Sequence, residues 1–337
     1  MSERPSFPLA VSMGEPAGVG PDIVLGLYAE RAAHGLPPFA LFGHVDFLRA
    51  RAARLGLPVE IRPATPAEAA EIFADALPVV PIEGLVADRP GEASPVSAPA
   101  VVKSIAAAVE ATLTGACRAL VTAPIHKGAL YASGFHYPGH TEYLAALCAN
   151  GGAAKAPVMM LMHEELRVVP LTIHVPLADV PKLVTGELIL TTARTLAHDL
   201  RTRFGIAAPK IGVAGLNPHA GEAGGIGQEE LEVIAPAVAE LKFEGLDVDG
   251  PFPGDTLFYP PLWRRFDAII AMYHDQALIP IKTVAFDSAV NTTLGLPIVR
   301  TSPDHGTAFD LAGTGKASVT SFLAALRLAD RLTAEHG

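Results

Sequence analysis

The feature that most constrains the fold is a regular alternation of short apolar runs with longer amphipathic stretches. The runs at 9–12, 39–42, 59–62 and 119–122 predict strands, and the stretches at 22–33, 45–55, 66–75 and 98–113 predict helices. Later stretches at 177–204, 228–243 and 317–335 predict further helices. This alternation is typical of βαβ units, so we expect an α/β fold with a largely parallel sheet.

Length and charge limit the classes of function. The 337 residues are enough for two domains, and a hydrophobic content of 50% can fill substantial cores. The 25 Lys and Arg against 35 Asp and Glu give a net charge of −10, which excludes a global basic field for nucleic acid or an anionic membrane. An anionic substrate must therefore meet local positive groups.

The sequence also predicts a cytoplasmic protein. No segment has the uninterrupted apolar length of a transmembrane helix, and the apolar stretch near the N-terminus is broken by proline and too short for a signal peptide. Cys117 and Cys148 lack CxxC spacing, which favours reduced packing residues over a disulfide or a zinc site.

Three histidines stand out because each follows an apolar run. His174 follows 168–173, His219 lies just beyond 211–216, and His274 follows 268–273. The carboxyl ends of parallel strands line a common ligand crevice, so the three imidazoles can converge there. Such a set suits a catalytic Zn²⁺ or a similar ion, although a single histidine after a strand is more often a capping or hydrogen-bonding residue.

Other residues are candidates for binding an anion. The loop GEPAGVGPD at 14–22 opens a helix, which favours negative charge, but it lacks the third glycine of GxGxxG and equally fits a tight turn. Lys127, Lys282 and Arg300 each follow or end an apolar, strand-like run. Capping alone explains Thr141, which lies beside His140 at a predicted helix start.

Taken together, the motifs resemble one family. The segments GEPAGVGPD, TAPIHKGAL, GHTE, TIHVPL, GLNPHAGE, GDTLF, AMYHDQ, NTTLGLPIVRTS and DHGTAFDLAGTGK are similar to the 4-hydroxythreonine-4-phosphate dehydrogenase family of vitamin B6 biosynthesis, and they span nearly the whole chain. The resemblance implies a homodimer with the two-domain fold of isocitrate and isopropylmalate dehydrogenases, largely parallel sheets and an interdomain cleft. We expect a discontinuous cofactor-side domain of 1–125 plus 295–337, and a substrate, metal and dimerisation domain of 126–294.

The resemblance also implies roles for individual residues. His174, His219 and His274 would bind one divalent Zn, Mg or Co ion, with the dimer partner contributing to the same site. His140, Thr141, Lys282, Asn291 and Arg300 would bind a small phosphorylated amino acid. His305, Gly306, Thr307 and Asp310 would bind NAD or NADP. Asp255 and Lys127 are the candidates for catalysis, Asp255 as a proton acceptor or an orienting group.

The implied reaction is oxidation of 4-phosphooxy-L-threonine to a β-keto acid, which loses CO₂ to give 3-amino-2-oxopropyl phosphate. Two enzyme alternatives stay open. A paralogous dehydrogenase would act on 4-phospho-D-threonate or 4-phospho-D-erythronate, although Glu15 and the His126-Lys127 pair favour the B6 enzyme. A metal-dependent hydrolase would use the same histidines without a nicotinamide cofactor. A non-catalytic phosphate-binding protein would not need them.

Overall fold

The computed structural model describes residues 7–149 and 156–334. The chain divides into two compact units, Met1–Pro157 with Leu296–Gly337 (unit 1) and Val158–Gly295 (unit 2). The first boundary therefore lies at 157 rather than at the predicted 125. The reason is that helices α6 (Lys127–Ala132) and α7 (His140–Ala149) both pack on α5 (Ala98–Leu113) of unit 1.

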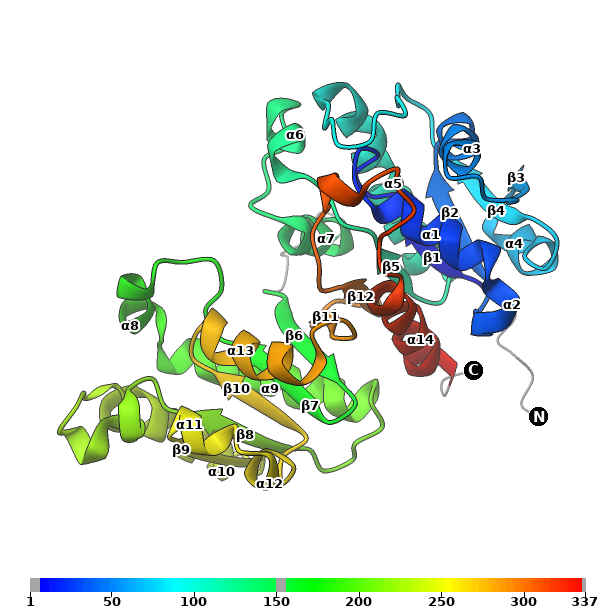
Figure 1. Ribbon diagram of the computed structural model, residues 1–337. Helices are drawn as coiled ribbons and strands as arrows, with labels where there is room; N and C mark the ends of the chain where they lie inside the picture. The colour runs from blue at the N-terminus through cyan, green and yellow to red at the C-terminus, as the bar shows by residue number, and fades with distance from the viewer. Residues whose placement is uncertain (1–6, 150–155, 335–337) are drawn as a thin grey trace. The chain divides into compact units, whose positions relative to one another are not determined.

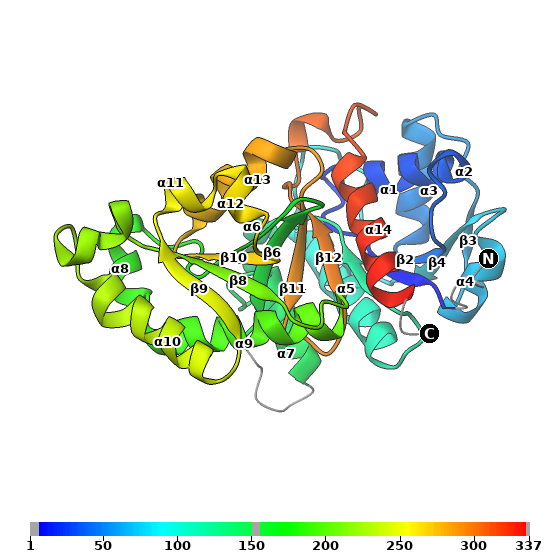
Figure 2. The same ribbon diagram turned by 90° about the horizontal axis from the view of Figure 1, so that it is seen from below.

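Unit 1 is built on a fully parallel sheet with the strand order β3-β4-β2-β1-β5-β12. Its strands are β1 (Leu9–Ser12), β2 (Phe39–Gly43), β3 (Ile61–Pro63), β4 (Leu77–Pro81), β5 (Leu120–Thr122) and β12 (Arg300–Pro303). Its other helices are α1 (Gly20–Ala29), α2 (Arg31–His34), α3 (Val45–Arg54), α4 (Pro66–Ile72), α14 (Thr320–Ala334) and the 3₁₀ turns Pro95–Ser97 and Phe309–Leu311. Figures 1 and 2 show α5 and α14 on opposite faces of this sheet.

Unit 2 has a mixed sheet with the order β11-β6-β7-β10-β8-β9, in which β6 is antiparallel to both of its neighbours. Its strands are β6 (Val158–His163), β7 (Leu166–Pro170), β8 (Lys210–Ala214), β9 (Asp247–Phe252), β10 (Ala268–Ala271) and β11 (Val290–Leu294). Its helices are α8 (Val180–Leu183), α9 (Gly186–Thr202), α10 (Ala235–Phe243), α11 (Gly254–Leu257), α12 (Pro260–Trp263) and α13 (His274–Ala285), with 3₁₀ turns at Leu177–Asp179 and Pro218–Gly224 and a π-turn at Glu230–Ile234.

The core of unit 2 lies between the sheet and α13. Ala277, Ile281 and Ala285 are four residues apart, so they form one face of α13, and all three are buried with Val168 and Ile269 of the sheet. Helices α9 and α10 cover the other face (Figure 2). This packing fixes the start of α13, which begins at His274.

The predicted α/β fold with largely parallel sheets is confirmed, but some elements differ. The predicted helix 177–204 is broken because Thr185 caps a new helix, accepting a hydrogen bond from the Leu188 amide at 3.2 Å. Helix Pro95–Leu113 is long and apolar enough to cross a membrane by length and composition alone, although Lys103 and Glu110 interrupt its apolar residues. It is 56% buried and packs on β1 and β2, as a core helix does.

Candidate active site

Two of the three predicted histidines meet at one edge of unit 2. Strands β7, β10 and β8 are parallel neighbours, so the segments that follow them leave the sheet at the same edge. The rings of His174 and His274 are 5.7 Å apart, and both line a pocket of about 300 Å³ with Thr172 and Tyr273. Asp275 Oδ1 lies 2.7 Å from His274 Nδ1, which leaves Nε2 as the nitrogen for a ligand.

His219 lies in an unusual turn beyond β8. The five residues from His219 to Ala223 all have φ between 44° and 76°, a left-handed turn in which only one of the five is glycine. Such backbone costs about 1–2 kcal/mol for each non-glycine residue, so surrounding contacts must hold it. The buried carboxylate of Glu230 fixes the residues before the turn, accepting the Leu216 and Asn217 amides at 2.7 Å each, and within the turn the Ala220 amide donates to the Asn217 carbonyl at 3.1 Å.

The third histidine does not complete a cluster within the chain. Among residues 7–149 and 156–334, no group of three or more His, Cys, Asp or Glu side chains is placed to hold a metal ion. His219 is exposed and does not line the pocket beside His174 and His274. The predicted convergence of all three within one chain is therefore not seen in this structure.

Gln276 connects two of the strand ends that bear these histidines. Its amide oxygen accepts the Met272 N–H at 2.7 Å, and its amide nitrogen donates to the Gly215 carbonyl at 2.8 Å. Sequence reasoning did not single out Gln276, although it stands two residues after His274. Asp255 lies at the start of α11 and is exposed, with Oδ1 accepting its neighbour's amide, the N–H of Thr256, at 2.8 Å.

Unit 1 holds a separate cluster around Arg300. The Arg300 side chain is buried, and its Nε and Nη2 donate to Thr122 Oγ1 at 3.1 and 2.6 Å. Burial lowers the pKa of Arg300 to about 10, which leaves it charged at neutral pH. Burial and the nearby Arg300 charge hold the pKa of His140 well below 6.5, so this imidazole is neutral.

The neutral His140 presents an unpaired atom to this cluster. Its Nε2 is buried and makes no hydrogen bond within the described part of the chain. Buried polar atoms rarely stay unpaired, so a ligand atom is the natural partner. Helix α7 begins at His140, which places Thr141 in the first turn and not, as predicted, at the cap. The Lys127 ammonium lies close to the start of α7, because a Cβ added to Gly139 would be 3.4 Å from it.

The remaining predicted substrate residues belong to unit 2. Asn291 lies in β11, and its buried Oδ1 has no hydrogen-bond partner in residues 7–149 and 156–334. Lys282 lies within α13, and its ammonium is 5.2 Å from the ring centre of Phe286. The prediction that Lys282 follows or ends a strand was wrong, because the apolar residues before it belong to a helix, in which Ile281 is buried and Ile279 is exposed. Arg300 begins a strand where it was expected to end one.

The predicted cofactor loop packs against the glycine-rich loop of unit 1. The Val19 amide donates to the Thr307 carbonyl at 2.9 Å, and a Cβ at Gly18 would lie 2.9 Å from that same oxygen. Gly14 packs closely on Ala123, since a Cβ added to Gly14 would lie 2.7 Å from the Ala123 Cβ. The glycines thus permit close packing of protein segments, which favours the tight-turn reading over a phosphate cradle.

The other predicted residues of the cofactor loop lie near the surface of unit 1. His305 is partly exposed, with Nδ1 2.9 Å from the Gly306 carbonyl oxygen, while Asp310 is exposed in a 3₁₀ turn. Ala308 adopts a left-handed conformation with φ 41°. The ring of Phe309 meets His126 edge to face at 5.0 Å, so this loop also contacts the segment that follows β5.

A pocket of about 520 Å³ lies beside these loops within unit 1. It is lined by Glu15, Pro16, Ala17, by Leu85, Val86, Ala87, Arg89, and by Glu92, Ala93, Ser94, Val96 and Ser97. Glu15 is 2% exposed and accepts the Ala17 amide at 3.1 Å. Burial raises its pKa despite that hydrogen bond and the nearby His126. The sequence offered one signal for this pocket, an acidic residue inside a glycine-rich loop.

Comparison with known proteins identifies the family. Residues 36–329 match the model of the family described as "Pyridoxal phosphate biosynthetic protein PdxA". The chain belongs to the PdxA family. A PdxA relative from Methylorubrum populi, named 4-hydroxythreonine-4-phosphate dehydrogenase, is 54% identical over 96% of this chain and 94% of its own length.

Solved structures agree with PdxA membership. The crystal structure of 4-hydroxythreonine-4-phosphate dehydrogenase from Klebsiella pneumoniae is 39% identical, covers 97% of this chain and 100% of its own, and gives a TM-score of 0.86. A terephthalate 1,2-cis-dihydrodioldehydrogenase from Burkholderia xenovorans is 30% identical, covers 96% of this chain and 98% of its own, and gives a TM-score of 0.65. The PdxA fold is therefore shared by dehydrogenases named for different substrates.

Proposed function

We propose that the protein is a dehydrogenase that oxidises 4-phosphooxy-L-threonine, in the formation of pyridoxal 5′-phosphate. The observation that supports this most strongly is the match to relatives of that name over almost the full length of both chains. The secondary hydroxyl loses its proton, and the carbon that bears it transfers a hydride to NAD⁺ or NADP⁺, which leaves a ketone. The resulting β-keto acid loses CO₂ to give 3-amino-2-oxopropyl phosphate.

The substrate carries two anionic groups, each of which needs a cation. Arg300 and Lys282 bind the phosphate or the carboxylate, and a guanidinium suits either because its fork matches two oxygens. The neutral His140 and the side chains of Thr141 and Asn291 supply hydrogen bonds. The unpaired atoms of His140 and Asn291 support this assignment, because a polar substrate satisfies groups that the protein leaves without partners.

A divalent Zn, Mg or Co ion fits the imidazole pair of unit 2. His174 and His274 would hold it, with Asp275 orienting the His274 ring, and His219 of a second copy in a homodimer would supply the further ligand that the chain alone does not bring there. When bound, such an ion favours the alkoxide and stabilises negative charge developed during decarboxylation. Asp255 and Lys127 are the residues proposed to move the protons.

The nicotinamide cofactor is assigned to unit 1. Residues 305–310 form the proposed cofactor loop, including His305, Gly306, Thr307 and Asp310. The glycine-rich loop contacts it through Val19 and Thr307, and residues 15–17 of that same glycine-rich loop line the pocket beside Glu15. The cofactor performs the hydride chemistry, while the loop positions it. Cytoplasmic localisation stays a prediction.

A dehydrogenase of 4-phospho-D-threonate or 4-phospho-D-erythronate is the second candidate. It is supported by the likeness to the Burkholderia xenovorans structure, which links the same fold to a dehydrogenase of another substrate. A hydrolase that needs no cofactor is the third reading, and binding of NAD⁺ separates it from both dehydrogenases.

The test is the formation of NADH or NADPH at 340 nm by metal-loaded protein. We expect turnover with 4-phosphooxy-L-threonine and loss of turnover in His174→Ala. The matched control is His198→Ala, which changes a histidine of α9 that no part of the proposed site uses. Turnover only with the D-threonate or D-erythronate phosphates would transfer the assignment to the second candidate, and no turnover with any of them would refute both.

A further inference from the structure

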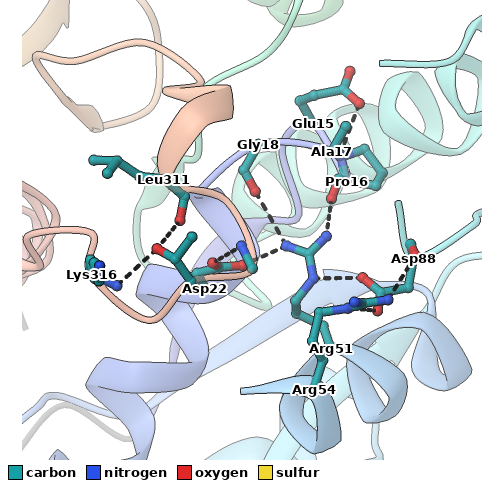
Figure 3. A network of polar contacts seen from close by, with 12 residues as sticks. Glu15, Pro16, Ala17, Gly18, Asp22, Arg51, Arg54, Asp88, Leu311 and Lys316 are labelled. Atoms are coloured by element: carbon teal, nitrogen blue, oxygen red, sulfur yellow. Dashed lines mark hydrogen bonds and ion pairs between the residues drawn. The ribbon is translucent and has the colours of Figure 1, made fainter. Parts of the chain in front are cut away.

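A buried guanidinium lies at the meeting point of the loops of unit 1. Arg51 of α3 is 0% exposed. Figure 3 shows its guanidinium between the glycine-rich loop and Asp88. Its Nη2 donates to the Pro16 carbonyl at 2.6 Å, its Nη1 to the Gly18 carbonyl at 3.4 Å and to Asp22 Oδ1, and its Nε to Asp88 Oδ1 at 2.6 Å. All four partners lie outside α3, and two are backbone carbonyls of the glycine-rich loop.

Asp22 connects Arg51 to the C-terminal loop, residues 305–316. Its second oxygen, Oδ2, accepts the Gly313 amide at 2.6 Å. The turn around Gly313 is closed by Thr314, whose hydroxyl donates to the Leu311 carbonyl at 2.7 Å and accepts the Lys316 amide at 3.2 Å (Figure 3). Arg51 is therefore one ion pair and one hydrogen bond away from the segment that directly follows the proposed cofactor loop.

Asp88 links the same guanidinium to the wall of the Glu15 pocket. Its neighbours Ala87 and Arg89 both line that pocket. Asp88 Oδ2 also accepts Nε of the half-exposed Arg54 at 2.6 Å, so the carboxylate bridges two arginines. The wall is further tied to the glycine-rich loop by the Gly91 amide, which donates to the Ala17 carbonyl at 2.8 Å.

The three loops are also in close steric contact. A Cβ at Gly313 would lie 2.6 Å from Pro90 Cγ, so the C-terminal loop touches the pocket wall without any space between them. Burying a charged group is costly, and a buried ion pair contributes little to stability compared with an apolar replacement of similar volume. What the guanidinium does supply is direction, since its planar donors fix several acceptors at set angles.

We propose that Arg51 is a positioning residue of the cofactor site. Its contacts to Pro16, Asp22 and Asp88 hold the glycine-rich loop, the C-terminal loop and the pocket wall in the one arrangement that binds the nicotinamide cofactor. The inference rests on the proposed function, and it adds a residue that touches neither cofactor nor substrate. Lysine in its place keeps the charge but cannot reach two carboxylates and two carbonyls from one ammonium.

The test compares Arg51→Lys with Arg49→Lys, the same change at an exposed arginine of the same helix. Cofactor Kd is measured by NADH and NADPH fluorescence, and KM for 4-phosphooxy-L-threonine at saturating cofactor. We expect the Arg51 variant to raise the cofactor Kd about tenfold or more with KM for the substrate changed less than about threefold. The control should stay within about twofold of the unmodified protein in both.

Asp88→Asn serves as a second variant in case Arg51→Lys does not fold. Its amide oxygen can still accept from Arg51, but the bridge to Arg54 is lost, so a smaller rise in cofactor Kd in folded protein is expected. Hydrogen exchange of segments 14–20, 83–94 and 305–316 should quicken in both variants. An unchanged cofactor Kd in a folded variant, or an equal rise in Kd and substrate KM, would overturn the inference. If the unmodified protein binds neither NADH nor NADPH, the proposed function itself fails, and the inference with it.

Discussion

Replacing Arg300 with methionine should make the protein more stable and far less active. Burial lowers the pKa of Arg300 from its ordinary value to about 10. At about 1.4 kcal/mol per pKa unit, keeping this charge in the folded protein costs about 3 kcal/mol relative to water. Because the folded-state pKa is the lower one, the charged form destabilises the fold at every pH below about 10.

Removing the Arg300 guanidinium removes this cost, but it also removes a hydrogen-bond donor. The buried Thr122 hydroxyl loses its partner, at a cost of about 1 kcal/mol or somewhat more. The expected net effect of Arg300→Met is an increase of about 1–2 kcal/mol in the free energy of unfolding in water. The same change removes the cation proposed to bind a substrate anion, so kcat/KM should fall about 10²-fold or more.

Urea unfolding at pH 7.5 in phosphate-free buffer measures the first effect, and steady-state kinetics with 4-phosphooxy-L-threonine measure the second. The control is Arg118→Met, which breaks the ion pair with Asp330 in the same unit and should lower stability without changing kcat/KM more than about twofold. If Arg300→Met is less stable than the unmodified protein and keeps kcat/KM within about fivefold, Arg300 is a structural residue and the reasoning is refuted.

Further predictions concern single groups. Burial raises the pKa of Cys117 to about 12, so a thiol reagent at pH 8 should leave it unlabelled until urea unfolds unit 1, and prompt labelling would contradict its burial. Glu230→Gln should lower the free energy of unfolding by about 2 kcal/mol, because the new NH₂ group faces amide donors; an unchanged urea midpoint would show that the carboxylate does not hold the turn. Although burial raises the pKa of Asp88, hydrogen bonds from Arg54 and Arg51 bring it below its ordinary 3.8. The ionised Asp88 carboxylate thus stabilises the fold above about pH 4, and this stabilisation is lost as the pH falls through the folded-state pKa. Between about pH 5 and pH 3, Asp88→Asn should therefore lose less stability than the unmodified protein. Acid titrations followed by circular dichroism measure this difference.

The strands of the parallel sheets were the most predictable part of the fold. The apolar run at 9–12 coincides with β1, because a strand buried on both faces needs apolar residues throughout. Strand β4 escaped prediction since its sequence, LPVVP, contains two prolines, and β9 escaped because DVDGPF is polar and lies at the sheet edge. Local patterns cannot reveal strands that form through tertiary context.

For the candidate site, the order of the strands could be predicted from the sequence, but the loops that follow them could not. The three strand ends that precede His174, His219 and His274 are adjacent and parallel, as expected. The left-handed turn at His219 could not be predicted, because four of its five residues disfavour that conformation and hydrogen bonds to the residues on either side help to hold it. Arg51 was missed for a similar reason, since its partners come from segments distant in sequence and no motif marks it.

The discontinuity of unit 1 has a consequence for synthesis of the chain. Unit 2 is continuous, so all its strands have been made once Gly295 is added. Unit 1 still lacks β12, which pairs with β5, and α14, which covers that edge. During translation β5 therefore presents an unpaired edge while the whole of unit 2 is being made, the state in which strands are most open to wrong pairing. The sheet of unit 1 can therefore be completed only after unit 2 and then β12 have been made.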